Sequence, residues 1–457
     1  MHSLMETETL PPRPVGAMQM PARVRIASRP QASWAFFFVV LFTVAVYARP
    51  QDVFTSFDAL HLPLVFGLAA GVTYLVALVS RHSSFYLPRE LAIVILLTLW
   101  YVFGIPFALW RGGSLQFLVQ VWLKTAFAFF LLTQTLTTIK RVRLLVWAII
   151  LSEFAVVLVT LIQSRHANWQ GERLAGFNQG ILGWNYFGIA LAMTIPYIAV
   201  LFLSGRSFLR ICFLAAMCLS LMWMLMLTAS RGGVLTVALS LILTFVLLLR
   251  HRTRGRVVFA LVALALVVAL ALAPSVLWTR LSTLWSNSNT PADQVTASAE
   301  ESTQQRIILL ERSFRYTMRH PIFGLGIGNF LVASGSEVGD ASGWYVTHNT
   351  FTQLSSEVGI PALLLFVGLL VMVVLRMKRT AGAFRANRPQ LEVSLLARAT
   401  IVSLLAFSFG GLFASLAYDY YVFYPIAIGV GLQMISLKHC RTALSRHSAV
   451  SRYPSAY

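Results

Sequence analysis

Residues 274–350 read PSVLWTRLSTLWSNSNTPADQVTASAEESTQQRIILLERSFRYTMRHPIFGLGIGNFLVASGSEVGDASGWYVTHNT, the one long polar segment in a chain that is otherwise almost continuously apolar. The segment passes through a Ser/Thr/Asn-rich tract and a basic stretch, and His348 and Asn349 end it directly before the next apolar span. Long loops are uncommon between neighbouring elements and often carry function. We therefore expect the chemistry of this protein in this segment.

The rest of the chain has the composition of a polytopic membrane protein, since 58% of its 457 residues are hydrophobic and only 11% are charged. A helix needs about 20 apolar residues to cross the hydrocarbon. We predict an all-α fold with about 12 transmembrane helices and one large outer loop at 274–350. The predicted spans are 33–48, 62–80, 91–110, 115–137, 144–162, 181–203, 209–228, 232–249, 257–273, 354–375, 394–416 and 420–437.

The distribution of charge predicts the orientation of the chain in the membrane. A net charge of +20 would suggest nucleic acid binding in a soluble protein, but here basic loops alternate with nearly neutral ones. Basic loops of membrane proteins stay in the cytoplasm. Most of the 36 Lys and Arg residues lie near positions 13–29, 81–89, 140–143, 206–210, 250–256, 376–388 and 438–452. We therefore predict cytoplasmic termini, an outer loop at 274–350 and no nucleic acid partner.

The same pattern divides the chain into segments. Residues 1–32 are rich in Pro and Arg and are predicted to form a disordered, basic cytoplasmic N-terminus. Residues 33–437 form the transmembrane domain, which contains the outer loop, and residues 438–457 form a cytoplasmic tail. Cysteines give no disulfide framework on the outer face, because Cys212 and Cys218 lie within one span and Cys440 lies in the tail.

Within the outer loop, residues 306–319 have the periodicity of a helix with two different faces. One face is apolar and carries Ile307, Leu310, Phe314 and Met318. Another face is cationic and carries Arg312, Arg315 and Arg319. This pattern predicts a helix that lies in the membrane interface, with its cations towards lipid headgroups or a polar cavity. The following Gly324-Leu-Gly-Ile-Gly328 is interpreted as a turn, because it lacks the βαβ context of a dinucleotide site.

Arg231 is the most informative single residue, because it lies between two spans at the membrane boundary. An arginine exposed to lipid there is costly, so it either faces a polar cavity or an anion, or extends to the headgroups. The neighbouring Ser230 and Gly232-Gly233 favour a functional site, since glycine lets backbone N–H groups approach an anion closely.

His348 and Asn349 lie where the outer loop meets the next span. A histidine can take a proton from an acceptor hydroxyl near neutral pH, whereas the alternative for this pair is a helix cap. Arg165, Arg173 and Arg306 add cations to the outer face, and arginine suits a diphosphate because it binds phosphate with two N–H groups. His166, His320 and His348 are too scattered in the sequence to be interpreted as a zinc site.

Charged residues within or at the edge of the spans allow two interpretations. They are either helix-packing partners or functional groups. These residues are Lys124, Glu153, Glu357 and Arg398.

Four motifs, in this order, resemble the O-antigen ligase and O-antigen polymerase superfamily of bacterial inner membranes. They are Arg173…Gly176-Phe177…Asn185, Ser230-Arg231-Gly232-Gly233, the block from Arg306 to Phe330, and His348-Asn349…Glu357-Val-Gly359. The resemblance covers roughly residues 160–375. His348, Asn349 and Gly359 match the ligase pattern, whereas Ala362 departs from the Gly, Thr or Tyr at its last position.

The resemblance implies a glycosyltransferase that needs no metal or other cofactor and acts at the periplasmic face of the bacterial inner membrane. Its donor would be an undecaprenyl-diphosphate-linked glycan, and its acceptor a lipid A-core, a growing glycan or a protein. His348 would be catalytic, and Arg165, Arg173, Arg231, Arg306 and Asn349 would bind substrate. Exopolysaccharide polymerase and protein O-oligosaccharyltransferase are alternatives within the family. A lipid-linked glycan flippase is the non-enzyme alternative, but it needs cations distributed through its core.

Overall fold

A computed structural model describes residues 33–50, 60–163, 169–170, 173–174, 184–205, 207–282, 294–339, 343–383 and 388–450. Nearly all of these residues are helical, as predicted for an all-α membrane protein. Within these described residues, ten helices are long and apolar enough to cross a membrane. They are α3 (Leu62–Val79), α4 with η2 (Arg89–Gly104, Ile105–Phe107), α5–η3–α6 (Arg111–Phe117, Leu118–Trp122, Leu123–Thr135), α7 (Ile139–Gln163), α8 (Trp184–Ser204), α9 (Phe208–Thr228), α10 with η4 (Arg231–Thr244, Phe245–Leu249), α15 (Thr350–Ala383), α16 (Arg388–Gly410) and α17 (Tyr420–Val450).

Two further predicted spans form helices that differ from a simple crossing. The span predicted at 33–48 is α1 (Ser33–Tyr47), which is shorter than a full crossing but packs against α3 and α7. The span predicted at 257–273 is α11 (Thr253–Ala271), and the chain then bends by 94° into α12 (Ser275–Ser282). Each predicted apolar span therefore corresponds to a helix, although ten of them meet the length of a crossing by themselves.

Several helices extend beyond their apolar spans on the basic side of the molecule. α15 continues to Ala383 and α17 to Val450, past the predicted limits at 375 and 437. The predicted tail at 438–457 is thus helical as far as Val450. Hydropathy locates only the part of a helix that lies in hydrocarbon, whereas Lys, Arg and Ala continue a helix readily in water.

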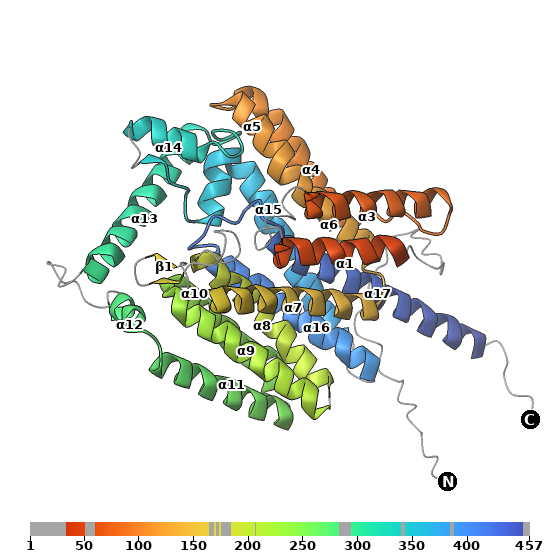
Figure 1. The fold of residues 1–457 in the computed structure, drawn as a ribbon. Helices are drawn as coiled ribbons and strands as arrows, with labels where there is room; N and C mark the ends of the chain where they lie inside the picture. Colours follow the sequence, from red (N-terminus) through yellow and green to blue (C-terminus); the bar gives the residue numbers. More distant parts are fainter. Residues whose placement is uncertain are drawn as a thin grey trace, which may run out of the picture.

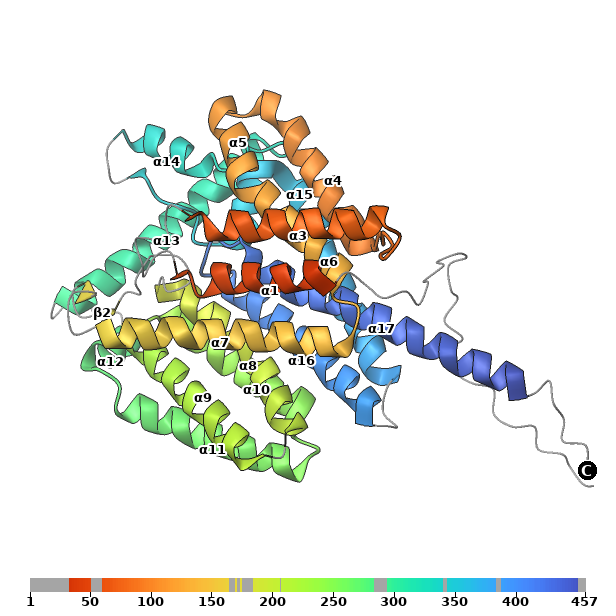
Figure 2. The same ribbon diagram turned by 45° about the vertical axis from the view of Figure 1, so that its right-hand side comes forward.

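The described part of the segment 274–350 is largely helical. It contains α12, α13 (Gln294–Arg319) and α14 (Phe330–Val338). Figures 1 and 2 both show these three helices together at one end of the molecule, with the short ladder of β1 (Trp169–Gln170) and β2 (Arg173–Leu174) nearby. We call this end the loop side.

Close packing of α8 against α10 places Arg231 at the loop side. A Cβ atom built on Gly188 would lie 2.3 Å from the Cα of Gly233, so these two helices touch through glycine backbone. The N–H of Gly233 donates to Ser230 Oγ, which caps α10. The prediction that Gly232 and Gly233 open the backbone to an anion is therefore wrong, because both are buried in helix packing.

We expect the loop side to face away from the cytoplasm, because the basic loops alternate with the neutral ones along the whole chain. Reporter fusions after Ala48 and Ser302 should be active only outside the cytoplasm, and fusions after Arg81 and Lys438 only inside it. An active cytoplasmic reporter at Ser302 would contradict this orientation.

Candidate active site

Three arginines from three different helices gather at the loop side. Arg231 begins α10, and its Nη2 donates to Thr303 Oγ1 of α13 over 2.9 Å. Arg280 lies in α12 and is only 6% exposed, and Arg306 lies in α13. α12 contacts both α10 and α13, which brings the three side chains into one cluster. We call Arg231, Arg280 and Arg306 the arginine cluster.

The charges of the arginine cluster act on one another. Burial and then the neighbouring charge of Arg231 lower the pKa of Arg306. The pKa of Arg280 is lowered to about 10, by burial first and then by Arg231 and Arg306. Like charges that are brought together out of water raise the free energy of the empty site. A ligand with two or more negative charges relieves this repulsion, so the cluster is suited to a polyanion.

His348 lies next to this cluster in a distinctive backbone conformation. Its φ of 51° is left-handed, which is uncommon for a residue with a side chain. Burial, and then the charge of Arg306, lower the pKa of His348 to about 4. The imidazole is therefore neutral at pH 7, and it is a weaker base than a free histidine as long as the charge of Arg306 is not offset.

The residues on both sides of His348 fix its position. Thr347 Oγ1 shares a hydrogen bond of 2.8 Å with Ser415 Oγ, and the N–H of Thr350 donates to the Gly411 carbonyl over 2.7 Å. Asn349 Oδ1 accepts from the N–H groups of residues 351 and 352 and thus caps α15. For Asn349 the structure supports the helix-cap interpretation.

The glycine-rich turn is fixed to α15 by backbone hydrogen bonds and a close contact at Gly359, which we together call the lock. Leu325 N–H donates to the Ser356 carbonyl over 2.9 Å and Gly326 N–H to the Glu357 carbonyl over 2.8 Å. α15 is interrupted at Gly359, where φ is 84° and a Cβ atom would lie 1.9 Å from the Ile322 carbonyl oxygen. Only glycine fits this position without displacing the turn. The motif is therefore a turn, as predicted, and it positions the chain on either side of His348.

Glu357 and Arg398 have structural partners. Glu357 accepts from the N–H of Gly328 over 3.1 Å and of Phe330 over 3.3 Å, which holds the turn and the start of α14. Arg398 donates to the Leu247 carbonyl over 2.6 Å. For both residues the helix-packing interpretation is therefore the better one.

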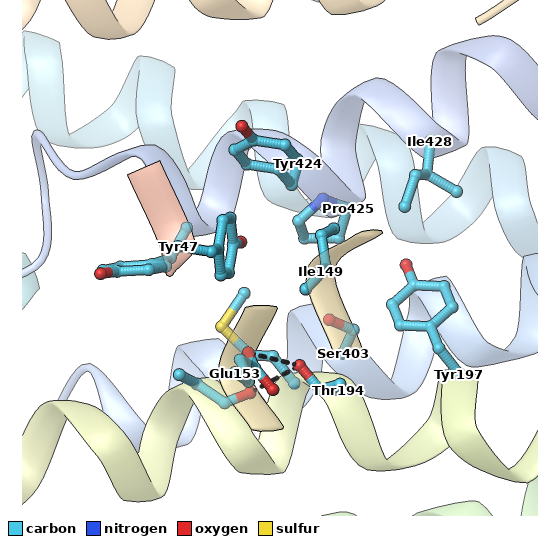
Figure 3. Close-up of a pocket in the computed structure, with 12 residues that line it drawn as sticks. Tyr47, Ile149, Glu153, Thr194, Tyr197, Ser403, Tyr424, Pro425 and Ile428 are labelled. Carbon is cyan, nitrogen blue, oxygen red and sulfur yellow. Dashed lines mark hydrogen bonds between the residues drawn. The ribbon is translucent and has the colours of Figure 1, made fainter. Parts of the chain in front are cut away.

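Glu153 lies inside the helix bundle and away from the loop side. Its carboxylate accepts from Thr194 Oγ1 over 2.9 Å in a small cavity that also contains Tyr47 and Tyr197 (Figure 3). The cavity has a volume of about 20 Å³, enough for one water molecule. A site of this size holds no glycan.

The predicted cationic face of α13 binds α14 in the structure. Arg312 Nη1 donates to Ser334 Oγ over 3.0 Å, and Arg315 forms an ion pair of 2.6 Å with Glu337. The apolar stripe with Ile307 and Phe314 is exposed, as expected for a helix in the interface. Arg312 and Arg315 therefore hold α14 on α13 and do not face headgroups or a polar cavity as predicted, whereas Arg319, the third residue of the predicted face, is exposed.

Of the two cations predicted between residues 163 and 180, the structure describes only Arg173. Arg165 lies outside the described residues, and so does His166. Arg173 belongs to β2, which pairs with β1 and contacts α9, the helix that ends at Thr228 shortly before Arg231.

Sequence reasoning missed Arg280. Its signal was available, because Val276, Leu277 and Leu281 give the residues after Pro274 the pattern of a short amphipathic helix with one cation. In the described part of the chain, no group of three or more His, Cys, Asp or Glu side chains could hold a metal ion.

The described residues thus combine a bundle of membrane helices with clustered arginines beside a neutral histidine at one end, an arrangement whose charge suits a polyanionic ligand. Residues 213–367, which contain the arginine cluster and His348, match the family model described as O-Antigen ligase. This region resembles the O-antigen ligase superfamily, as the motifs indicated, and the match supports an enzyme of the glycosyltransferase type. No curated protein matches the chain.

Proposed function

We propose that the protein moves a glycan from undecaprenyl diphosphate to an acceptor hydroxyl at the periplasmic face of the bacterial inner membrane. The observation that carries this proposal is the arginine cluster beside His348, because it provides cations for a diphosphate and a base within one site. Arg165, Arg173 and Asn349 are proposed to bind the remainder of the donor or the acceptor.

The reaction is a direct displacement at the anomeric carbon. The acceptor oxygen forms a bond to this carbon, and the bond from the carbon to the diphosphate oxygen breaks. The proton of the acceptor hydroxyl passes to His348, and the electron pair of the broken bond leaves with the lipid diphosphate. The arginine cluster stabilises the charge that develops on this leaving group.

The acceptor is a hydroxyl on a lipid A-core, a growing glycan or a protein. These alternatives are separated by supplying each acceptor to the purified protein together with the lipid-linked donor. A flippase would instead move the donor across vesicles without any acceptor. The placement of the arginine cluster at one end of the molecule favours transfer over transport.

We expect Arg280→Gln to weaken binding of the lipid-diphosphate donor about 10- to 100-fold, since hydrogen bonds to charged groups contribute about 1.5–3 kcal/mol. The matched control is Arg319→Gln, because Arg319 is exposed at the end of α13. Donor binding is measured with the full-length protein in detergent, and thermal stability is followed to detect misfolding. A well-folded Arg280→Gln variant with wild-type donor affinity would remove Arg280 from the site.

A further inference from the structure

A second cationic feature lies on the other side of the helix bundle. A cavity of about 540 Å³ opens between α1, α3, η3–α6 and the start of α17. Figures 1 and 2 show α1 and α3 well apart from α12, and the cavity shares no lining residue with the arginine cluster. The lining residues are Phe42, Arg49, His61, Pro63, Leu64, Gly67, Leu68, Gln120, Lys124, Phe127 and Tyr420. We call this cavity the lateral groove.

The lateral groove is polar at one end and apolar at the other. Arg49 follows the end of α1 and His61 precedes the start of α3, so both belong to the polar end. Phe42 lies in α1, about two turns before Arg49, and Leu68 lies about two turns after the start of α3. A charged end followed by an apolar channel matches the headgroup and chain of a lipid.

Lys124 provides a positive charge to the lateral groove. Its side chain is exposed, and it forms no hydrogen bond or ion pair with the described residues. Gln120, Lys124 and Phe127 lie on one face of η3–α6. Along this face the side chains change from polar to apolar, as they do along α1 and α3. The π-helical turn η3 ends two residues before Lys124, and such turns are frequent at functional sites. Of the two sequence interpretations, the functional one therefore fits Lys124.

The polar end of the groove faces the loop side. Thr125, the neighbour of Lys124, donates through Oγ1 to the Tyr418 carbonyl over 2.9 Å. Tyr418 belongs to the same α16–α17 connection that holds Thr347 through Ser415. The polar end of the groove and His348 therefore both lie near the α16–α17 connection.

We propose that the lateral groove binds one anionic phospholipid from the leaflet at the loop side. The phosphate lies against Lys124, with Arg49 and His61 beside it, and one acyl chain follows Phe42 and Leu68. Three features support a lipid. The lining residues include no carboxylate within the described part of the chain, the volume suits a headgroup with the start of one chain, and Leu64 and Leu68 are half exposed at its rim.

The test uses the full-length protein in detergent and two probes that differ only in headgroup, phosphatidylglycerol and phosphatidylcholine with identical acyl chains. Native mass spectrometry measures how much of each lipid stays bound. We expect wild type to retain phosphatidylglycerol preferentially, and Lys124→Gln to reduce its affinity about fivefold, the contribution of one cation near a membrane surface. Leu68→Trp should reduce retention of both lipids, since it fills the apolar end of the groove.

Three comparisons make the result specific. Lys140→Gln makes the same chemical change at an exposed position at the start of α7 and should leave binding unchanged. Arg306→Gln should also leave phosphatidylglycerol binding unchanged, so a loss in this variant would assign the lipid to the arginine cluster and overturn the proposal. Displacement by millimolar inorganic pyrophosphate, or equal retention of both lipids by wild type, would overturn it as well. None of these outcomes depends on glycan transfer.

Discussion

Replacement of His348 by alanine is expected to slow glycan transfer by about 10²–10⁴-fold while donor binding stays intact. The imidazole is neutral because burial and Arg306 lower its pKa to about 4, and a bound diphosphate that offsets the charge of Arg306 would strengthen it as a proton acceptor. The measurement pairs a transfer assay with donor binding on the same preparation. Full transfer by His348→Ala, or a loss of donor affinity as severe as that of Arg280→Gln, would contradict the role of His348 as a base.

The pH dependence of the wild type follows from the same pKa. A lowered pKa means that the neutral form is present above about pH 4 and is lost as the pH falls through this value. The profile of kcat/KM reports the free enzyme and should therefore fall near pH 4. Bound diphosphate offsets the charge of Arg306 and raises the pKa of His348, so the profile of kcat should fall at a higher pH. Profiles that coincide would show that donor charge does not reach His348.

Arg231→Lys is expected to lose about two orders of magnitude in transfer rate although the charge is kept. The Arg231 guanidinium donates to Thr303 through Nη2, and its planar shape suits two parallel hydrogen bonds to a phosphate, whereas a lysine ammonium is a single point charge. Arg250→Lys is the matched control, because Arg250 lies just past the other end of the same helix and is exposed. Wild-type turnover by Arg231→Lys would return this residue to a role in contacting headgroups.

The membrane helices and the position of the site were predictable because both depend on local composition. Every predicted apolar span contains a helix, since runs such as 354–375 are too apolar to be stable in water, although α16 ends at Gly410, before the predicted limit at 416. Arg231, Arg306 and His348 were selected as cations and a titratable group beside the membrane, and the structure brings them to the same end of the molecule.

The contacts that organise the site were not predictable, because they join residues far apart in the chain through backbone groups. The lock between the glycine turn and Gly359 leaves no periodic pattern of side chains. Trp100 donates from α4 to the Val358 carbonyl over 3.0 Å, and Leu109 N–H donates to the Leu325 carbonyl. Local signals equally fail to separate a glycine that exposes backbone from one, such as Gly233, that lets two helices touch.

The lock has a consequence for how the protein is made. The turn at residues 321–328 rests on a tip formed early in synthesis, between α4 and α5, and on an interruption in α15 that is translated later. Thr347 and Thr350 form their hydrogen bonds to residues 411–415 only after α16 has been synthesised. The ribosome must therefore deliver almost the entire chain to the membrane before His348 reaches its final place. A nascent chain that ends after α15 carries the arginines and the histidine but lacks the partners of Thr347 and Thr350, so we expect His348 to be held in place only once residues 411–415 have been made.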